Sequence, residues 1–223
     1  MAIQTKMTEY KQGEEGYSAM VKDITSLFDW DSTEENEGNT NTSFKKNCGD
    51  GNGYVGLRIE KGSNYPSVSL ICGNGSANYS TNINSSSGSS SRYVAYAYNA
   101  NVLAFCGAQG QLPWTQYNYP FFSGISTSKN IKTNKTGYCC FGGDYGSSRF
   151  YSEENYASDY VSITVRANCT IAAAIPLHNP SAAVISNDAL LLTALPDTKY
   201  ACLEDVTFNG TRYTRLGMIL VPA

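Results

Sequence analysis

Histidine is almost missing from this chain, which contains only His178. A Ser-His-Asp triad, a Cys-His dyad or a multi-histidine metal site would have to be built around this residue or do without histidine. His178 lies in Pro176-Leu-His-Asn-Pro180, where the flanking prolines favour an ordinary turn. We expect no catalytic residue, no metal site and no cofactor.

Charge is also scarce, because Asp, Glu, Lys and Arg make up 16% of the sequence, against about 25% in typical soluble domains. The net charge is −3 and the basic residues are scattered, so nucleic acid is not an expected partner. The chain has no long apolar run, and its start, MAIQTKMTEYKQ, has no apolar leader segment, so we expect neither a membrane span nor a secretion signal. A polar, weakly charged surface suits a protein covered by neighbours in an assembly, or one that offers hydroxyls and amides for binding.

The sequence has seven cysteines and no Cys-x-x-Cys motif. An odd number of cysteines without an export signal indicates reduced thiols in a cytoplasm. The adjacent pair Cys139-Cys140 could be read as a redox or metal element. Neighbouring side chains of a strand point to opposite faces, however, so the two thiols could not bind one ion together. We expect both to serve in packing.

One helical pattern stands near the start of the chain. Apolar residues at spacings of three and four predict a helix of about three turns that begins after residues 13–16 and ends near residues 29–31. A helix this short is not stable alone. Its apolar face therefore packs either on the chain's own β-structure or on a neighbouring subunit, in which case it is a docking helix. The residues of this face are Tyr17, Met20, Val21, Ile24, Leu27 and Phe28.

Residues 31–43, DSTEENEGNTNTS, are acidic and polar with no apolar periodicity, which is typical of a linker or an exposed loop. Beyond them the pattern changes to alternating β-forming residues separated by turn residues. We therefore expect an N-terminal arm with a helix and an acidic linker (1–43) and a β-rich domain (44–223). The fold class is all-β, mainly an antiparallel sandwich or barrel, with a short N-terminal amphipathic helix. The expected strands are 54–59, 67–72, 93–98, 102–106, 160–165 and 170–175.

The C-terminal part contains a hairpin candidate with Asn209-Gly210 at its turn, because this dipeptide accommodates the two positive φ angles of a type I′ turn. After it, residues 216–221 are apolar enough for one buried strand. Residues 186–195 are ambiguous. Ser186 could cap a short helix, which we prefer, or Asn187-Asp188 could turn another hairpin.

The aromatic stretch 112–122 is the most suggestive candidate for a ligand or interface site. Trp114, Tyr117 and Tyr119 are residue types that stack on sugar rings or anchor protein interfaces. The alternative is that these rings and the neighbouring prolines simply close one end of a β domain. Residues 144–156 have a similar polar-aromatic character, and both stretches at one end would form a recognition surface.

Other motifs carry less weight. Asp50-Gly-Asn-Gly53 opens like a calcium loop, but Tyr54 and Val55 stand where an oxygen ligand and the turn glycine should follow. The 19 acidic residues also offer accidental pairs, so the two facing carboxylates of a glycosidase cannot be recognised from sequence.

The overall plan resembles that of minor virion proteins of tailed bacteriophages. It combines a leaderless start, a short amphipathic helix, an acidic linker, a Gly/Ser/Tyr-rich β domain and a closing hairpin at 206–221. The resemblance implies a decoration, tail or fibre protein of the virion, assembled in the bacterial host cytoplasm and bound to copies of itself and other virion proteins. A lectin-like module for host surface glycans is the first alternative, and a glycan-cleaving enzyme is the second.

Overall fold

The computed structural model describes residues 2–47, 53–73, 79–82, 92–109, 121–143, 148–152, 155–161, 174–179, 183–192 and 202–223. These residues form one helix and seventeen strands, and every strand pair is antiparallel, which confirms the all-β expectation. The elements are β1 (Gln4–Tyr10), α1 (Gly13–Leu27), β2 (Ser32–Glu35), β3 (Asn41–Asn47), β4 (Tyr54–Glu60), β5 (Ser67–Cys72), β6 (Tyr79–Asn82), β7 (Arg92–Tyr98), β8 (Val102–Gln109), β9 (Phe121–Asn130), β10 (Thr136–Gly143), β11 (Ser148–Ser152), β12 (Asn155–Val161), β13 (Ala174–Asn179), β14 (Val184–Leu192), β15 (Cys202–Phe208), β16 (Thr211–Leu216) and β17 (Ile219–Pro222).

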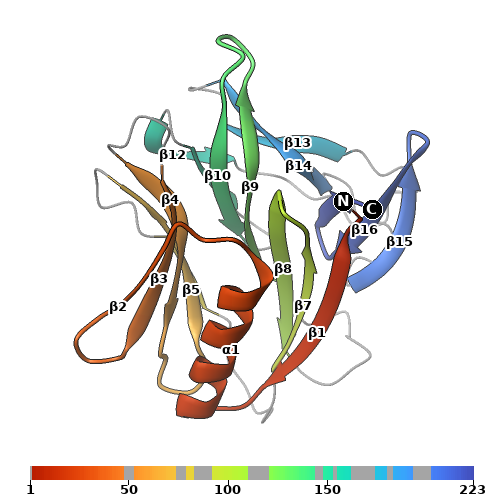
Figure 1. Cartoon of the computed structure of the whole chain (residues 1–223). Coiled ribbons are helices and arrows are strands. Elements are labelled where there is room, and N and C mark those ends of the chain that lie inside the picture. Colours follow the sequence, from red (N-terminus) through yellow and green to blue (C-terminus); the bar gives the residue numbers. More distant parts are fainter. Residues whose placement is uncertain are drawn as a thin grey trace.

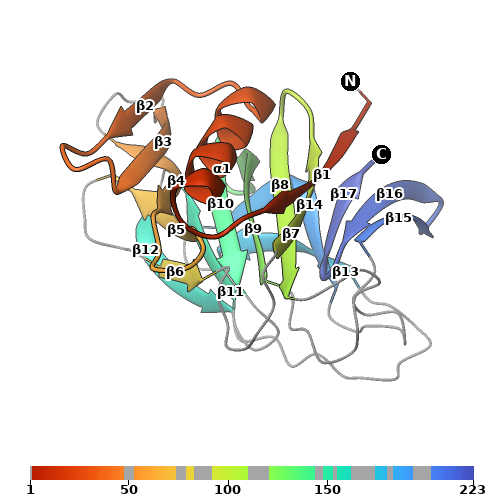
Figure 2. The same cartoon turned by 90° about the horizontal axis from the view of Figure 1, so that it is seen from below.

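The strands form two sheets (Figure 1). The smaller sheet has the order β2-β3-β4-β5-β6. The larger one has the order β1-β7-β8-β9-β14-β17-β16-β15, with β10, β11 and β12 branching from β9 and β13 pairing with β14. The larger sheet curls into a barrel-like shape, because β15 and β16 come back into contact with β7. Helix α1 lies between the smaller sheet and the β1-β7-β8 part of the larger one (Figure 2).

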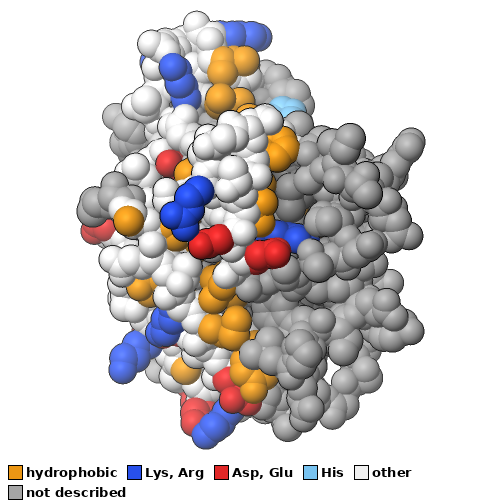
Figure 3. All heavy atoms as spheres, turned by 90° about the vertical axis from the view of Figure 1, so that its right-hand side faces the viewer, with side chains coloured by type: hydrophobic (Ala, Val, Ile, Leu, Met, Phe, Trp, Pro, Cys, Tyr) orange, Lys and Arg blue, Asp and Glu red, His pale blue; other side chains and the backbone are white. Residues whose placement is uncertain are grey.

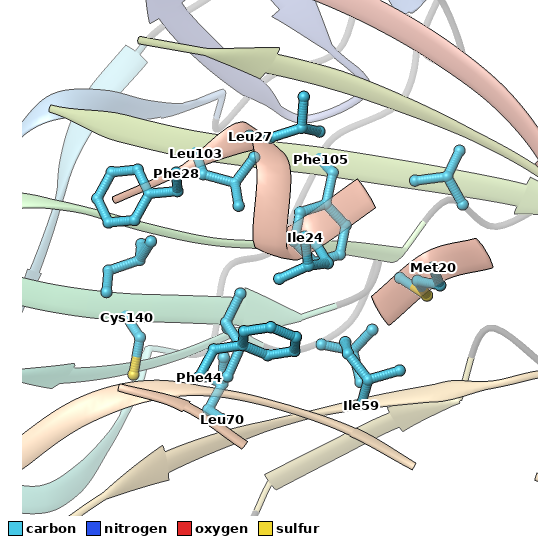
Figure 4. Packing of buried hydrophobic residues seen from close by; sticks show 14 of the residues in the cluster. Met20, Ile24, Leu27, Phe28, Phe44, Ile59, Leu70, Leu103, Phe105 and Cys140 are labelled. Atoms are coloured by element: carbon cyan, nitrogen blue, oxygen red, sulfur yellow. The ribbon is translucent and has the colours of Figure 1, made fainter. Parts of the chain in front are cut away.

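The first of two cores lies under the helix, and we call it the helix-side core. Met20, Ile24 and Leu27 of α1 are buried in one cluster with side chains that come from both sheets (Figure 4). Phe44, Ile59 and Leu70 come from the smaller sheet, and Leu103, Phe105 and Cys140 come from the larger sheet. The residues of the apolar helical stripe thus join the two sheets into one unit.

The second core fills the inside of the curl, and we call it the barrel core. Small residues on β7 and β8, Ala95, Ala97 and Ala104, face it, which lets β16 approach both strands closely. Along β7 the neighbouring residues Val94 and Tyr96 face the helix-side core instead. Both faces of these strands are therefore buried, which explains why their sequences are almost continuously apolar.

The N-terminal residues are more ordered than the sequence suggested. The expected linker 31–43 contains β2 and the first residues of β3, which pair with each other, so describing it as a linker was wrong. Before the helix, β1 pairs with β7 over all seven of its residues. A polar sequence without apolar periodicity can still form a two-stranded edge when the next strand, here β3, is held by β4.

Two expectations for the C-terminal part were also wrong. Residues 186–192 form neither a helix nor a hairpin, because they belong to the single strand β14. Residues 216–221 are all buried, as expected, but they are not one strand, since a turn with Gly217 at φ 59° separates β16 from β17.

The hairpin at Asn209-Gly210 is confirmed. It joins β15 to β16, and the two residues have φ angles of 48° and 79°, as a type I′ turn requires. The expected strands at 54–59, 67–72, 93–98 and 102–106 are present too, whereas 162–165 and 170–173 lie outside the described residues.

The two ends of the chain lie near each other on one side of the molecule (Figures 1 and 2). Ile3 packs against the barrel core, to which Val221 belongs. Within the described ranges, no helix combines the length and the apolar character that a membrane crossing demands.

Candidate functional site

Part of the predicted site cannot be placed. Trp114, Tyr117 and Tyr119 lie outside the described residues, as does the Asp50–Asn52 segment of the calcium-like motif. The end of the aromatic stretch is described. Phe121 and Phe122 begin β9 and are buried, one in the helix-side core and the other in the barrel core. These two rings therefore serve packing.

The six residues of the predicted docking helix lie in and around the helix-side core. Tyr17, Met20, Ile24, Leu27 and Phe28 are buried there, and Val21 packs against it half-exposed. This arrangement is the first of the two alternatives, packing on the chain's own β-structure. The apolar face of α1 is thus covered from within the chain and does not serve as a docking surface for a neighbouring subunit.

Among the described residues, the most buried carboxylate is that of Asp23 on the inward face of α1, a residue that was not predicted as part of a site. Its oxygens accept hydrogen bonds from Lys6 Nζ at 2.5 Å, Thr8 Oγ1 at 2.9 Å and the hydroxyl of Tyr10 at 2.6 Å. The Tyr10 hydroxyl also lies 2.6 Å from that of Tyr96. Asp23 follows Met20 by three residues and precedes Ile24, so an acid within the apolar helical stripe was the available signal.

Burial raises the pKa of Tyr10 far above its usual range, and the neighbouring Tyr96 and Asp23 raise it further. Burial likewise raises the pKa of Tyr96. Both phenols therefore stay protonated at any physiological pH and can donate hydrogen bonds. The network attaches α1 to β1 and β7, and its ionic group is matched by the Lys6 ammonium.

A second buried charge, Lys46 of β3, sits where the two sheets meet. Its ammonium lies 2.9 Å from Asp31 Oδ1 and 3.7 Å from Asp29 Oδ2. The same group lies 5.2 Å from the ring centre of Tyr138 on β10 and 5.8 Å from that of Phe28, which are cation–π distances. Burial alone would lower the pKa of Lys46, but the hydrogen bond that it donates to Asp31 and the nearby Tyr138 and Asp29 raise this pKa above the ordinary value.

The two adjacent cysteines face opposite sides of β10, as expected. Cys139 is buried in the barrel core and Cys140 in the helix-side core. Burial raises the pKa of the Cys139 thiol to about 12, and it raises that of Cys140 well above its ordinary value. Both thiols are therefore protonated at neutral pH, where a thiol is a poor nucleophile and a poor metal ligand.

Small polar side chains form a row inside the barrel core. Ser126 Oγ of β9 lies 2.7 Å from Ser186 Oγ of β14 and 3.3 Å from Cys139 Sγ. Next to this row, Thr127 Oγ1 donates a hydrogen bond to Asp188 Oδ2 at 2.5 Å. Burial raises the pKa of Asp188, although the hydrogen bond from Thr127 opposes this shift.

At the end of the same strands lies a hollow of about 200 Å³, including the solvent at its mouth. The Ser152 hydroxyl on its wall has no hydrogen-bond partner among the described residues. Of this space only about 10 Å³ is open to the centre of a water-sized group, so the hollow suits a water molecule and not a larger ligand. It is lined by Ser128, Asn130, Lys135, Thr136, Gly137, Ser152 and Val184.

His178 lies in β13 and not in a free turn. It pairs with Ile185, and its Nδ1 lies 2.9 Å from the carbonyl oxygen of Pro176. In the described part of the chain, no three His, Cys, Asp or Glu side chains gather closely enough to hold a metal ion.

The surface on the right-hand side of Figure 1 carries basic and acidic side chains interspersed over its described part, without a patch of one sign (Figure 3).

Comparisons with protein-family models, curated proteins and solved structures find no match for this chain. The fold itself places the chain in the class of all-β proteins, with a barrel-like sheet and, among the described residues, one helix.

Proposed function

We propose that this protein is a non-enzymatic structural component of a tailed-bacteriophage particle. In this role it assembles with copies of itself and other particle proteins in the bacterial host cytoplasm. The observation that supports the proposal most directly is how the fold uses its buried reactive groups. Asp23 attaches α1 to β1, Lys46 joins the two sheets, and the Cys139 thiol is protonated inside a core. In this fold, the buried carboxylate, ammonium and thiol groups therefore contribute to the packing and joining of its elements.

The assembly part of the proposal is supported by the surface and by the sheet edges. Only 16% of the residues are charged. Covering such a surface with a neighbouring subunit carries a small desolvation penalty, because few charged groups lose their water. The larger sheet ends at β1, which is regular along its length and thus offers a strand edge to other chains. The phage assignment itself is supported by the resemblance in overall plan.

The light-scattering mass of the purified full-length chain tests the proposal. We expect a multimer of defined size at micromolar concentration, and electron microscopy should show closed rings or regular particles when other particle proteins are added. A chain that stays monomeric over a hundred-fold range of concentration and is left out of such particles would contradict the proposed function.

Binding of host surface glycans is the alternative role, and it is supported by the residue types of the 112–122 stretch. A glycan array that presents diverse bacterial polysaccharides tests it. Binding that is lost in Trp114→Ala but kept in Trp30→Phe would favour this role, because Trp30 packs against Phe28 and Phe44 in the fold. Silence across the array would contradict it. Release of sugar from any of these polysaccharides would instead favour the third role, a glycan-cleaving enzyme.

A further inference from the structure

The outer edge of β1 differs from three other strand edges, those of β2, β13 and β15. Strand β1 is seven residues long and pairs in regular register with β7, its only strand partner among the described residues. Its middle residue, Met7, is 39% exposed, and Thr5 and Glu9 on the same face are exposed too. The one lysine of the strand, Lys6, is bound to Asp23. Nothing in the described part of the chain therefore guards this edge with a free positive charge, a proline or a bulge, which are the usual protections.

The edges at β2 and β15 carry such protections. Strand β2 has four residues, and two of them are the exposed acids Glu34 and Glu35. Strand β15 is distorted at Leu203, which has a φ of 59° beside a break in register, and the exposed acids Glu204 and Asp205 follow. The short β2 and the distorted β15 therefore fit an added strand less well than the regular seven-residue β1 does.

A further edge strand, β13, is distorted as well. It contains Pro176 next to a break in its register with β14. Proline cannot donate a backbone hydrogen bond to an added strand. This edge is therefore also a poor template for pairing.

We propose that β1 pairs, antiparallel, with β1 of a second copy of this chain, so that the larger sheets of two copies become continuous. The proposal rests on the proposed function and names the surface through which the chain associates with itself. A two-fold axis perpendicular to the sheet keeps the same face of both copies on the same side. The register centred on Met7 is the one that pairs all seven residues of the strand.

This register is also compatible in charge. It places Met7 opposite its own symmetry mate, so the exposed apolar side chain of one copy covers that of the other. Glu9 lies opposite Thr5, and Lys6, already paired with Asp23, lies opposite Thr8. Like charges directly opposite each other destabilise a strand pair. This register contains no such pair. A register centred on Lys6 would place two lysines face to face.

The test places charges on the proposed axis and measures the mass of the full chain by sedimentation and light scattering. Met7→Lys and Met7→Glu each put two like charges opposite each other, so we expect each variant to associate at least about ten-fold more weakly than the original chain. An equimolar mixture should regain association as a mixed pair of Lys and Glu copies. The matched control is Ile131→Lys, because Ile131 is the other large exposed apolar residue in the described part of the chain, 62% exposed in the turn between β9 and β10. It should associate like the original chain.

The possible outcomes separate the two proposals. If the original chain is a multimer and Met7→Lys leaves its mass unchanged, the β1 surface is wrong while the proposed function stands. If both charged variants dissociate but their mixture does not associate, the Met7-centred register is wrong. If the original chain is monomeric at every concentration, self-pairing is wrong. The same conclusion holds if β1 of a monomeric chain accepts a strand from a different protein. Circular dichroism of each variant checks that the fold is intact, which we expect because Met7 lies at the surface.

Discussion

Single residues hold this fold together through contacts that join different elements, and Ile24 of α1 is the simplest case. It has no exposed surface and contacts residues of the helix-side core. Ile24→Ala would leave a cavity among Phe44, Ile59 and Phe105, which pack around it (Figure 4). We expect the free energy of unfolding to fall by about 2–5 kcal/mol. Chemical denaturation measures this change, and Thr25→Ala on the exposed side of the same helix should cost under about 1 kcal/mol.

Asp188 gives a prediction about pH. Burial raises its pKa in the folded protein, so the folded chain binds this proton more tightly than the unfolded chain does. Stability is then lost as the pH rises from about 3.9, the usual value for unfolded aspartate, through the raised folded pKa. Asp188→Asn removes this loss and keeps an oxygen that accepts from Thr127. We expect a higher Tm than the original chain at pH 7, and a difference that shrinks below pH 4.

Thermal unfolding at both pH values measures the Asp188→Asn effect. The matched control is Asp205→Asn, because Asp205 is exposed and forms its ion pair with the exposed Arg212. An exposed ion pair contributes between zero and about 1 kcal/mol. An Asp188→Asn variant that is less stable than the original chain at pH 7 would show that the carboxylate contributes favourable contacts that outweigh its burial.

At the scale of elements, the sequence predicted regular patterns well and irregular segments poorly. The helical stripe, four of the expected strands and the Asn209-Gly210 hairpin depend on local signals that the fold keeps. The segment at Ser186 shows why others fail. Strand β14 pairs with β9 up to Ser186 and with β17 from Leu190, so the residues between them bend as the strand changes partners. Ser186 Oγ accepts hydrogen bonds from the backbone N–H groups of Asp188 and Ala189, as a helix cap would. Ser186 thus makes the hydrogen bonds of a helix N-cap, but it makes them at a bulge in strand β14.

The candidate site was harder to predict than the fold. The buried network around Asp23 joins residues from α1, β1 and β7, and its two tyrosines, Tyr10 and Tyr96, are 86 positions apart along the chain. Only the position of Asp23 within an apolar stripe hinted at it. The contacts of Lys46 depend on β10 meeting β3, and nothing local to either strand indicates this meeting.

The N-terminal segment gives the prediction at this scale. Deletion of residues 1–30 removes β1 and α1, and with them six side chains of the helix-side core that are 8% exposed or less. We expect the truncated chain to lose its cooperative unfolding transition, which circular dichroism and denaturant titration would detect. A truncated chain that folds normally and fails only to assemble would show that the segment is a docking arm after all.

At the scale of the whole molecule, both ends of the chain lie near each other on one side (Figures 1 and 2). A fold whose ends are neighbours can sit inside a loop of a larger host polypeptide as readily as at its tip, because the host loop need not stretch to accommodate it. The entry and exit points would then form a short stalk. Everything attached to this module, before it or after it, would leave from the side where β1 begins.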